Sequence, residues 1–125
     1  MKTIIISSIP HEEQIYPTCG DYHETEDEIH IVVSDMGDEQ LEHLVIIHEL
    51  TEVILMRARG IPLQASTDFD LEVESTGKDV DEPGDLPDCP YGREHNFATA
   101  VERMVGAALN IKWADYTKAV DALFP

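Results

Sequence analysis

The residues best suited to chemistry lie in the apolar segment 44–56, which contains His48, Glu49 and Glu52. Most other residues of this segment are aliphatic, so a helix formed by it would be buried on most of its surface. Burying an unpaired carboxylate costs roughly several kcal/mol, and a divalent cation would offset that cost directly. The segment therefore predicts a buried helix that binds a metal ion.

The spacing of these residues agrees with metal binding. His48 and Glu52 are four residues apart, which places them on one helix face with Cβ atoms about 5–6 Å apart. Glu49 is rotated by about 100° from His48, so it can approach the open side of an ion and take a proton from an activated water. The alternative is that both glutamates face solvent and pair with basic side chains. Of the candidates Arg57 and Arg59, only Arg57 comes close to Glu52 in sequence.

The motif His48-Glu49-Leu-Thr-Glu52 resembles the H-E-x-x-H motif of zincin metallopeptidases, as an H-E-x-x-E variant in which Glu52 replaces the second histidine. The lead-in, where Gly20-Asp-Tyr-His precedes residues 28–33, is similar to the edge-strand hairpin before the active-site helix of minimal zincins. The resemblance covers roughly residues 20–60 and implies a metallopeptidase-like hydrolase with Glu49 as general base. The whole chain also resembles small phage and prophage proteins, a likeness that implies no activity.

In zincins with a glutamate ligand, the third ligand begins a second helix, and His95 holds that place here. The resemblance thus implies a ligand set of His48, Glu52 and His95. Two imidazoles and one carboxylate suit a catalytic Zn²⁺ with an open coordination position, and they also suit Fe²⁺ or Mn²⁺. Glu102, seven residues after His95, is a candidate fourth ligand or an acceptor for an imidazole N–H. Alternatively, His95 and Glu102 are solvent-exposed residues of their helix.

Two strands and a helix are expected to position the first ligand pair. Residues 3–9 and 28–33 are short and rich in β-branched side chains, which predicts strands. The helix is predicted over residues 38–59, because Asp38 is a favourable N-cap and Gly60 favours a helix end.

The remaining helices complete the expected fold. A second main helix is predicted over residues 91–110, and a short C-terminal helix over residues 113–124. The predicted apolar face of the second helix consists of Phe97, Ala98, Val101, Met104, Val105, Ala108 and Leu109. We expect a single domain over residues 1–125 with a minimal zincin-like α+β fold, in which a small N-terminal antiparallel sheet packs on two main helices.

A long acidic segment connects the two main helices. Residues 68–74 alternate acidic and apolar side chains, which favours an edge strand, and Asp68 and Asp70 remain possible ligands. Residues 66–90 contain nine acidic residues and one lysine, which predicts a long solvated loop. Two alternatives are a lid over the metal cleft and a Ca²⁺ site, although the spacing is not that of an EF-hand. The Ca²⁺ candidates are Asp79, Asp81, Glu82, Asp85 and Asp88.

The charge of the chain limits its partners. Twenty-six acidic residues oppose eight basic ones, which gives a formal net charge of -18. Nucleic acids require clustered Lys and Arg, and anionic membranes would repel this chain, so neither is expected as a partner. Metal ions and basic protein surfaces are expected instead. No apolar run approaches the ~20 residues of a membrane span, and the N-terminal run is too short for a signal peptide, so we expect a cytoplasmic protein.

The two cysteines, Cys19 and Cys89, are expected to be reduced thiols. A single disulfide and a role of Cys89 near the metal site are the alternatives. The sequence leaves the oligomeric state open.

Three functions compete on this sequence. The first is a zinc-dependent hydrolase of zincin type that acts on a peptide or another amide. The second is a non-enzymatic, phage-type acidic protein that mimics nucleic-acid charge or inhibits a basic partner, with a merely structural metal. The third is Mg²⁺-dependent nucleotide hydrolysis through Glu49-x-x-Glu52. That activity requires a second acidic pair on another helix, and the E-x-x-D matches Glu24–Asp27 and Glu82–Asp85 fall in turn-like segments.

Overall fold

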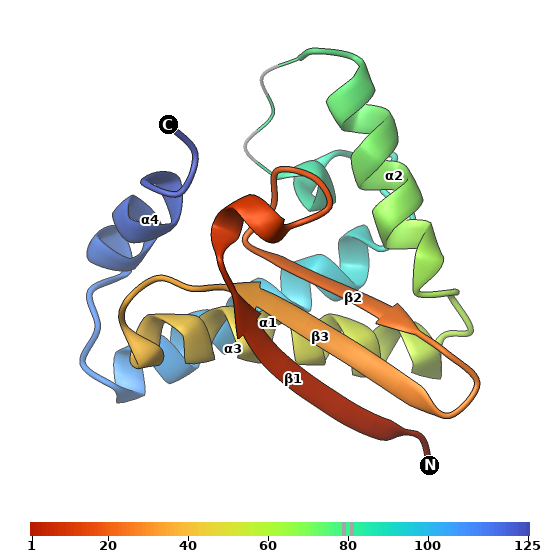
Figure 1. Ribbon diagram of the computed structural model, residues 1–125, viewed down its shortest axis with the longest axis horizontal. Helices are drawn as coiled ribbons and strands as arrows, with labels where there is room; N and C mark the ends of the chain where they lie inside the picture. Colours follow the sequence, from red (N-terminus) through yellow and green to blue (C-terminus); the bar gives the residue numbers. More distant parts are fainter. Residues whose placement is uncertain (79, 81) are drawn as a thin grey trace.

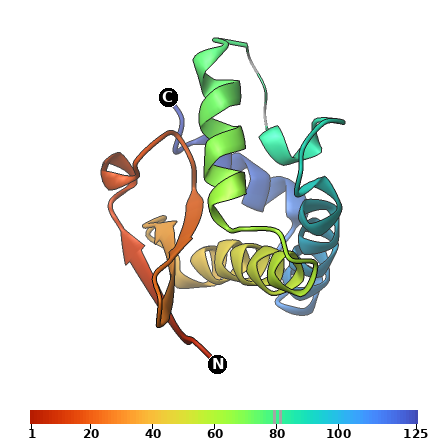
Figure 2. The same ribbon diagram turned by 90° about the vertical axis from the view of Figure 1, so that its right-hand side faces the viewer.

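The computed structural model has the predicted α+β class, and the residues that it describes form one small sheet and four α-helices (Figure 1). Viewed along the edge of the sheet, the sheet, helix α1 (Glu39–Ala58) and helix α3 (Gly92–Ala108) follow one another as layers (Figure 2). The buried apolar core lies mainly between the sheet and α1. The structure describes residues 1–78, 80 and 82–125.

The sheet is built around its central strand β3 (Glu28–Ser34). Alternate residues of a strand point to opposite faces, and here Ile29, Ile31 and Val33 form the buried face. β2 (Gly20–Glu24) lies at one edge and pairs antiparallel with β3, as expected for a hairpin.

The strand at the other edge, β1 (Thr3–Ile9), pairs with β3 in the parallel direction. The prediction of an antiparallel sheet is therefore wrong for β1. After β1, residues 10–19 and their short 3-10 helix η1 (His11–Glu13) carry the chain to the opposite edge, where β2 runs back. β3 then returns between the two strands in the direction of β1.

Helix α1 matches its predicted span closely. The Asp38 side chain caps it by accepting a hydrogen bond from the Gln40 backbone N–H at 3.0 Å. After its C-terminus, Gly60 adopts a φ of +72°, a conformation that glycine tolerates best. Because α1 has the sheet on one side and α3 on the other, it is buried along much of its surface. Within the described residues, no helix combines the length and apolar character needed to cross a membrane.

The acidic segment is not a single loop. Residues 68–74, predicted as an edge strand, belong to helix α2 (Gln64–Ser75). The buried residues of α2 are Ser66 and Thr67, which precede the alternating residues. Alternation of acidic and apolar residues is thus also compatible with a mostly exposed helix, and here it did not indicate a strand. The segment also contains a 3-10 helix, η2 (Pro83–Asp85). The Ca²⁺ candidates Asp79 and Asp81 lie outside the described residues.

Helix α3 and helix α4 (Trp113–Asp121) lie where helices were predicted, but the buried face of α3 differs from the prediction. Its buried residues are Glu94, His95, Ala98, Glu102 and Gly106. Phe97 and Met104, expected to be buried, are 56% and 71% exposed. The face of α3 that meets α1 is thus largely ionisable, which is costly unless those groups are paired or bind an ion.

Candidate metal centre

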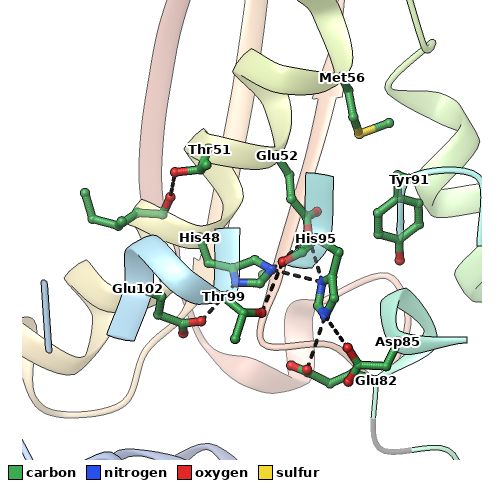
Figure 3. A network of polar contacts seen from close by, with 12 residues as sticks. His48, Thr51, Glu52, Met56, Glu82, Asp85, Tyr91, His95, Thr99 and Glu102 are labelled. Carbon is green, nitrogen blue, oxygen red and sulfur yellow. Dashed lines mark hydrogen bonds and ion pairs between the residues drawn. The ribbon is translucent and has the colours of Figure 1, made fainter. Parts of the chain in front are cut away.

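Three buried side chains from α1 and α3 direct their metal-binding atoms toward one another (Figure 3). The Nε2 atom of His48 lies 2.7 Å from Oε2 of Glu52 and 3.2 Å from Nδ1 of His95. The same Nδ1 atom lies 2.9 Å from Oε2 of Glu52. The structure therefore brings together the three residues that were expected to be the ligand set.

The donor atoms fit a divalent transition metal. A tetrahedral zinc ion with bonds of about 2.0 Å holds its ligand atoms about 3.3 Å apart. The observed separations of 2.7, 2.9 and 3.2 Å are slightly shorter, so small outward movements of the side chains would admit an ion. Two imidazole nitrogens and one carboxylate oxygen are suitable ligands for zinc, iron and manganese.

Helix geometry explains how these atoms meet. His48 and Glu52 are one turn apart on α1, so both face α3. His95 lies in the first turn of α3, where its backbone N–H donates to the Tyr91 carbonyl oxygen at 2.9 Å. All three side chains are buried, which excludes the alternative that His95 is a solvent-exposed helix residue.

Each histidine also has a carboxylate at its second ring nitrogen. Nδ1 of His48 lies 2.9 Å from Oε1 of Glu102. Nε2 of His95 lies 3.3 Å from Oε2 of Glu82 and 3.2 Å from Oδ1 of Asp85. Carboxylates in this position orient a ligating imidazole and fix its tautomer. Of the two roles predicted for Glu102, its geometry matches the acceptor of an imidazole N–H rather than a fourth ligand.

Tyrosine hydroxyls satisfy the carboxylates around the centre, and all four tyrosines of the chain take part. Tyr22 donates to Oε1 of Glu52 at 2.8 Å, and Tyr116 donates to Oε2 of Glu102. The other two hydroxyls, those of Tyr16 and Tyr91, both donate to Asp70 of α2. Neutral donors leave the negative charge of these carboxylates in place, which favours a cation.

Basic side chains pair elsewhere on the molecule. Arg57, the predicted partner of Glu52 in the solvent-facing alternative, instead forms an ion pair with Glu24 at 2.8 Å. Arg59 pairs with Glu94 at 2.7 Å. Since Glu49 and Glu52 are both buried, the alternative in which they face solvent is wrong.

Glu49 packs against the edge strand. A Cβ atom at Gly20 of β2 would lie only 2.7 Å from Oε1 of Glu49, so any other residue there would force the Glu49 side chain to move. Its carboxyl group accepts no side-chain or backbone hydrogen bond from the described residues, and burial raises its pKa well above the usual value. Glu49 is thus a buried acid adjacent in sequence to His48, with its carboxyl group against β2.

The pKa values describe the centre without a metal. Burial alone would raise the pKa of Glu52, but hydrogen bonds from His48 and His95 lower it to about 2. Burial alone would lower the pKa of both histidines, but Glu102 and Glu52 raise that of His48 to about 11. Glu52 and Glu82 raise the pKa of His95 to about 10. Without a metal, these shifts favour an ionised Glu52 between two protonated imidazoles, so a cation that binds there displaces their protons.

Several residues near the centre were not anticipated. The tyrosine donors give no local sequence signal, because they act across long sequence separations. Asp70 was considered as a ligand, but it accepts tyrosine hydrogen bonds and lies outside the ligand set. Both cysteines are free thiols, as predicted, and burial raises the pKa of Cys89 to about 11.

Removing one tyrosine hydroxyl tests whether this shell positions the ligands. We expect Tyr116→Phe to weaken zinc binding about tenfold, because Glu102 then loses the donor that holds it against Nδ1 of His48. Affinity would be measured by competition with a chromophoric chelator. Tyr16→Phe is the matched control, since it removes a hydroxyl from Asp70, which touches neither histidine. Equal effects of the two variants would contradict a positioning role for Tyr116.

The candidate ligands keep the composition that the zincin resemblance implies, but the carboxylate and the second histidine have exchanged helices. α1 supplies one histidine and the carboxylate, His48 and Glu52, and α3 supplies the second histidine, His95. Compared with known proteins, the chain matches no protein-family model, no curated protein and no solved structure.

Proposed function

We propose that this protein is a zinc-dependent hydrolase of zincin type that cleaves a peptide or another amide, with His48, Glu52 and His95 as metal ligands. The observation that carries this proposal is the convergence of two imidazole nitrogens and one carboxylate oxygen within 3.2 Å in a buried setting. Glu82 and Asp85 at His95, and Glu102 at His48, support the ligand assignment because they orient both rings.

Glu49 is the proposed general base. A bound zinc ion would supply Lewis acidity and lower the pKa of water. Glu49 takes the proton of the attacking water and delivers it to the leaving amine. Its pKa is raised without a metal, and a nearby positive ion favours the carboxylate form, which is the form a base requires.

We further propose that the protein acts in the cytoplasm on a peptide or protein substrate. Its charge of -18 favours basic segments as substrates or partners and disfavours nucleic acids and anionic membranes. The Mg²⁺-dependent alternative lacks support, because Glu24 pairs with Lys2 and Arg57, and the Glu82–Asp85 pair lies at η2 beside His95.

The second candidate function is an acidic binding protein with a structural metal. The burial of His48, Glu52 and His95, which are 8%, 4% and 5% exposed, favours it, because a structural site needs no access for substrate. Glu49 separates the two functions, since a structural site has no use for a general base.

Metal content and turnover test the proposal together. Protein purified without a His-tag and dialysed should retain about one zinc ion per chain, and His48→Ala should lose it. His43→Ala is the matched control, because His43 is an exposed histidine of the same helix. Glu49→Gln should keep the ion and lower kcat on a fluorogenic peptide library at least about a hundredfold.

The outcomes separate the two candidates. If wild type and His48→Ala both lack metal after supplementation with zinc, the metal centre is refuted. If zinc is present and Glu49→Gln leaves binding to a basic protein surface unchanged while no peptide is cleaved, the structural alternative holds. Added salt should then weaken that binding strongly.

A further inference from the structure

The second ring nitrogen of His95 faces a separate group of potential ligands. Its Nε2 atom lies 3.2 Å from Oδ1 of Asp85 and 3.3 Å from Oε2 of Glu82 (Figure 3). The imidazole is buried, whereas the two carboxylates are 59% and 56% exposed. His95 thus has one nitrogen in the buried ligand set and the other directed at two largely exposed carboxylates.

These separations suit a metal ion. They match the distance of about 3.3 Å between neighbouring ligand atoms around a tetrahedral zinc ion. One imidazole nitrogen and two carboxylate oxygens are again a transition-metal donor set, and exposure leaves room for water as a further ligand.

Orientation of His95 alone would not require this arrangement. A single carboxylate is enough to orient a ligating imidazole, as Glu102 does for His48. His95 has two carboxylates, and the ligand atoms of Glu82 and Asp85 lie within 4.8 Å of each other. Neither forms an ion pair with a Lys or Arg of the described residues, and both lie within 3.3 Å of Nε2 of His95.

The backbone of η2 lies close to the His95 imidazole at Gly84. A Cβ atom at Gly84 would lie 2.4 Å from Cγ of His95, so the backbone of η2 packs directly on the imidazole. Glycine at this position allows Glu82 and Asp85 to reach Nε2 from the two ends of one short 3-10 turn.

We propose that Nε2 of His95, Glu82 and Asp85 form a second divalent cation site, so that the His95 imidazole bridges an inner and an outer metal ion. The Nε2 proton leaves to solvent when the outer ion binds, and the ring then donates one nitrogen to each ion. The outer site takes imidazole-binding ions such as Zn²⁺ or Cu²⁺. It shares His95 with the proposed function, but its own two carboxylates allow it to be tested separately.

Titration with added Zn²⁺ counts the sites. We expect two equivalents for wild type, with the exposed outer ion the weaker and lost on dialysis. The double variant Glu82→Gln/Asp85→Asn should bind one equivalent. Glu72→Gln/Glu74→Gln removes the same charge from exposed positions of α2 and should still bind two. A one-equivalent wild type whose affinity merely falls in Glu82→Gln/Asp85→Asn would overturn the proposal, because these carboxylates would then only orient His95.

Binding of Cu²⁺ tests whether the His95 imidazole bridges the two ions. Wild type loaded with two Cu²⁺ should show a weakened electron paramagnetic resonance signal, because an imidazole bridge couples the two spins. Glu82→Gln/Asp85→Asn should regain the full signal of one isolated ion. Two bound Cu²⁺ with two uncoupled signals would overturn the bridging role of His95.

His48→Ala distinguishes this proposal from the proposed function. If both sites exist, it should retain only the outer equivalent. If wild type binds one ion that His48→Ala keeps and Glu82→Gln/Asp85→Asn loses, the outer site stands and the inner hydrolytic site fails.

Discussion

The variant Glu52→Gln is expected to lower the free energy of unfolding of the metal-free protein by about 3–5 kcal/mol at pH 6, and to abolish retention of the inner metal ion. In the metal-free centre, Oε2 of Glu52 lies between the rings of His48 and His95, at 2.7 and 2.9 Å. Without its charge, two protonated imidazoles whose nearest nitrogen atoms are 3.2 Å apart would lack the carboxylate between them. Unfolding in urea with a chelator present measures the loss.

The pH dependence of this loss has a defined sign. The folded pKa values of His48 and His95 are raised to about 11 and about 10, so the stability that depends on their protonation is complete below the unfolded value of about 6.5. That stability disappears as the pH rises through the folded values. The difference between wild type and Glu52→Gln should therefore be largest near pH 6 and should shrink toward pH 11. It should also shrink below the unfolded glutamate pKa, because the folded pKa of Glu52 is lowered to about 2.

An exposed glutamate on the same helix provides the control. Glu39 lies 3.7 Å from His43, and both side chains are more than half exposed. Glu39→Gln should change stability by no more than about 0.5 kcal/mol. If Glu52→Gln behaved like Glu39→Gln at pH 6, the buried ion-pair arrangement would be contradicted.

The positions of the two candidate ligands on α1 could be predicted because their geometry is local. His48 and Glu52 are related by one helical turn, and the N-cap and glycine stop of that helix can be recognised in the sequence. Their burial also followed from the aliphatic residues around them. His95 is a different case, since its place opposite α1 depends on tertiary packing and was expected from a family resemblance.

Features that depend on partners distant in sequence were missed. Residues 68–74 alternate in a way that suits a strand, but they belong to helix α2, whose buried residues Ser66 and Thr67 precede them. Tyr16 reaches Asp70 across 54 residues, and Tyr22 reaches Glu52 across 30. No periodic pattern connects such residues.

The prediction of which face of α3 is buried was wrong for a related reason. Its apolar side chains suggested that Phe97 and Met104 would be buried, whereas the helix instead buries His95 and Glu102 against α1. Hydrophobic periodicity assumes that apolar burial decides the orientation of a helix. Here the ionisable groups have partners on α1 and α4, so their burial is tolerated.

Metal affinity should increase steeply with pH, which is the second large effect. With folded pKa values of about 11 and about 10, both His48 and His95 carry a proton that a metal ion must displace at neutral pH. Release of two protons makes the apparent affinity of the inner site rise about a hundredfold per pH unit between pH 6.5 and 8.5. Competition with a chelator of known protonation behaviour, at three pH values in this range, gives the slope.

A site built from histidines with unperturbed pKa values near 6.5 would behave differently, because its affinity would level off above about pH 7.5. Glu102→Gln provides an internal check, since Glu102 is the strongest influence that raises the pKa of His48. Without that carboxylate His48 gives up its proton at lower pH, so the slope should fall from about two protons toward one. A flat affinity profile above pH 7.5 in wild type would mean that the two rings are neutral before the metal arrives. The paired-imidazolium description of the metal-free centre, and with it the large effect expected for Glu52→Gln, would then both be wrong.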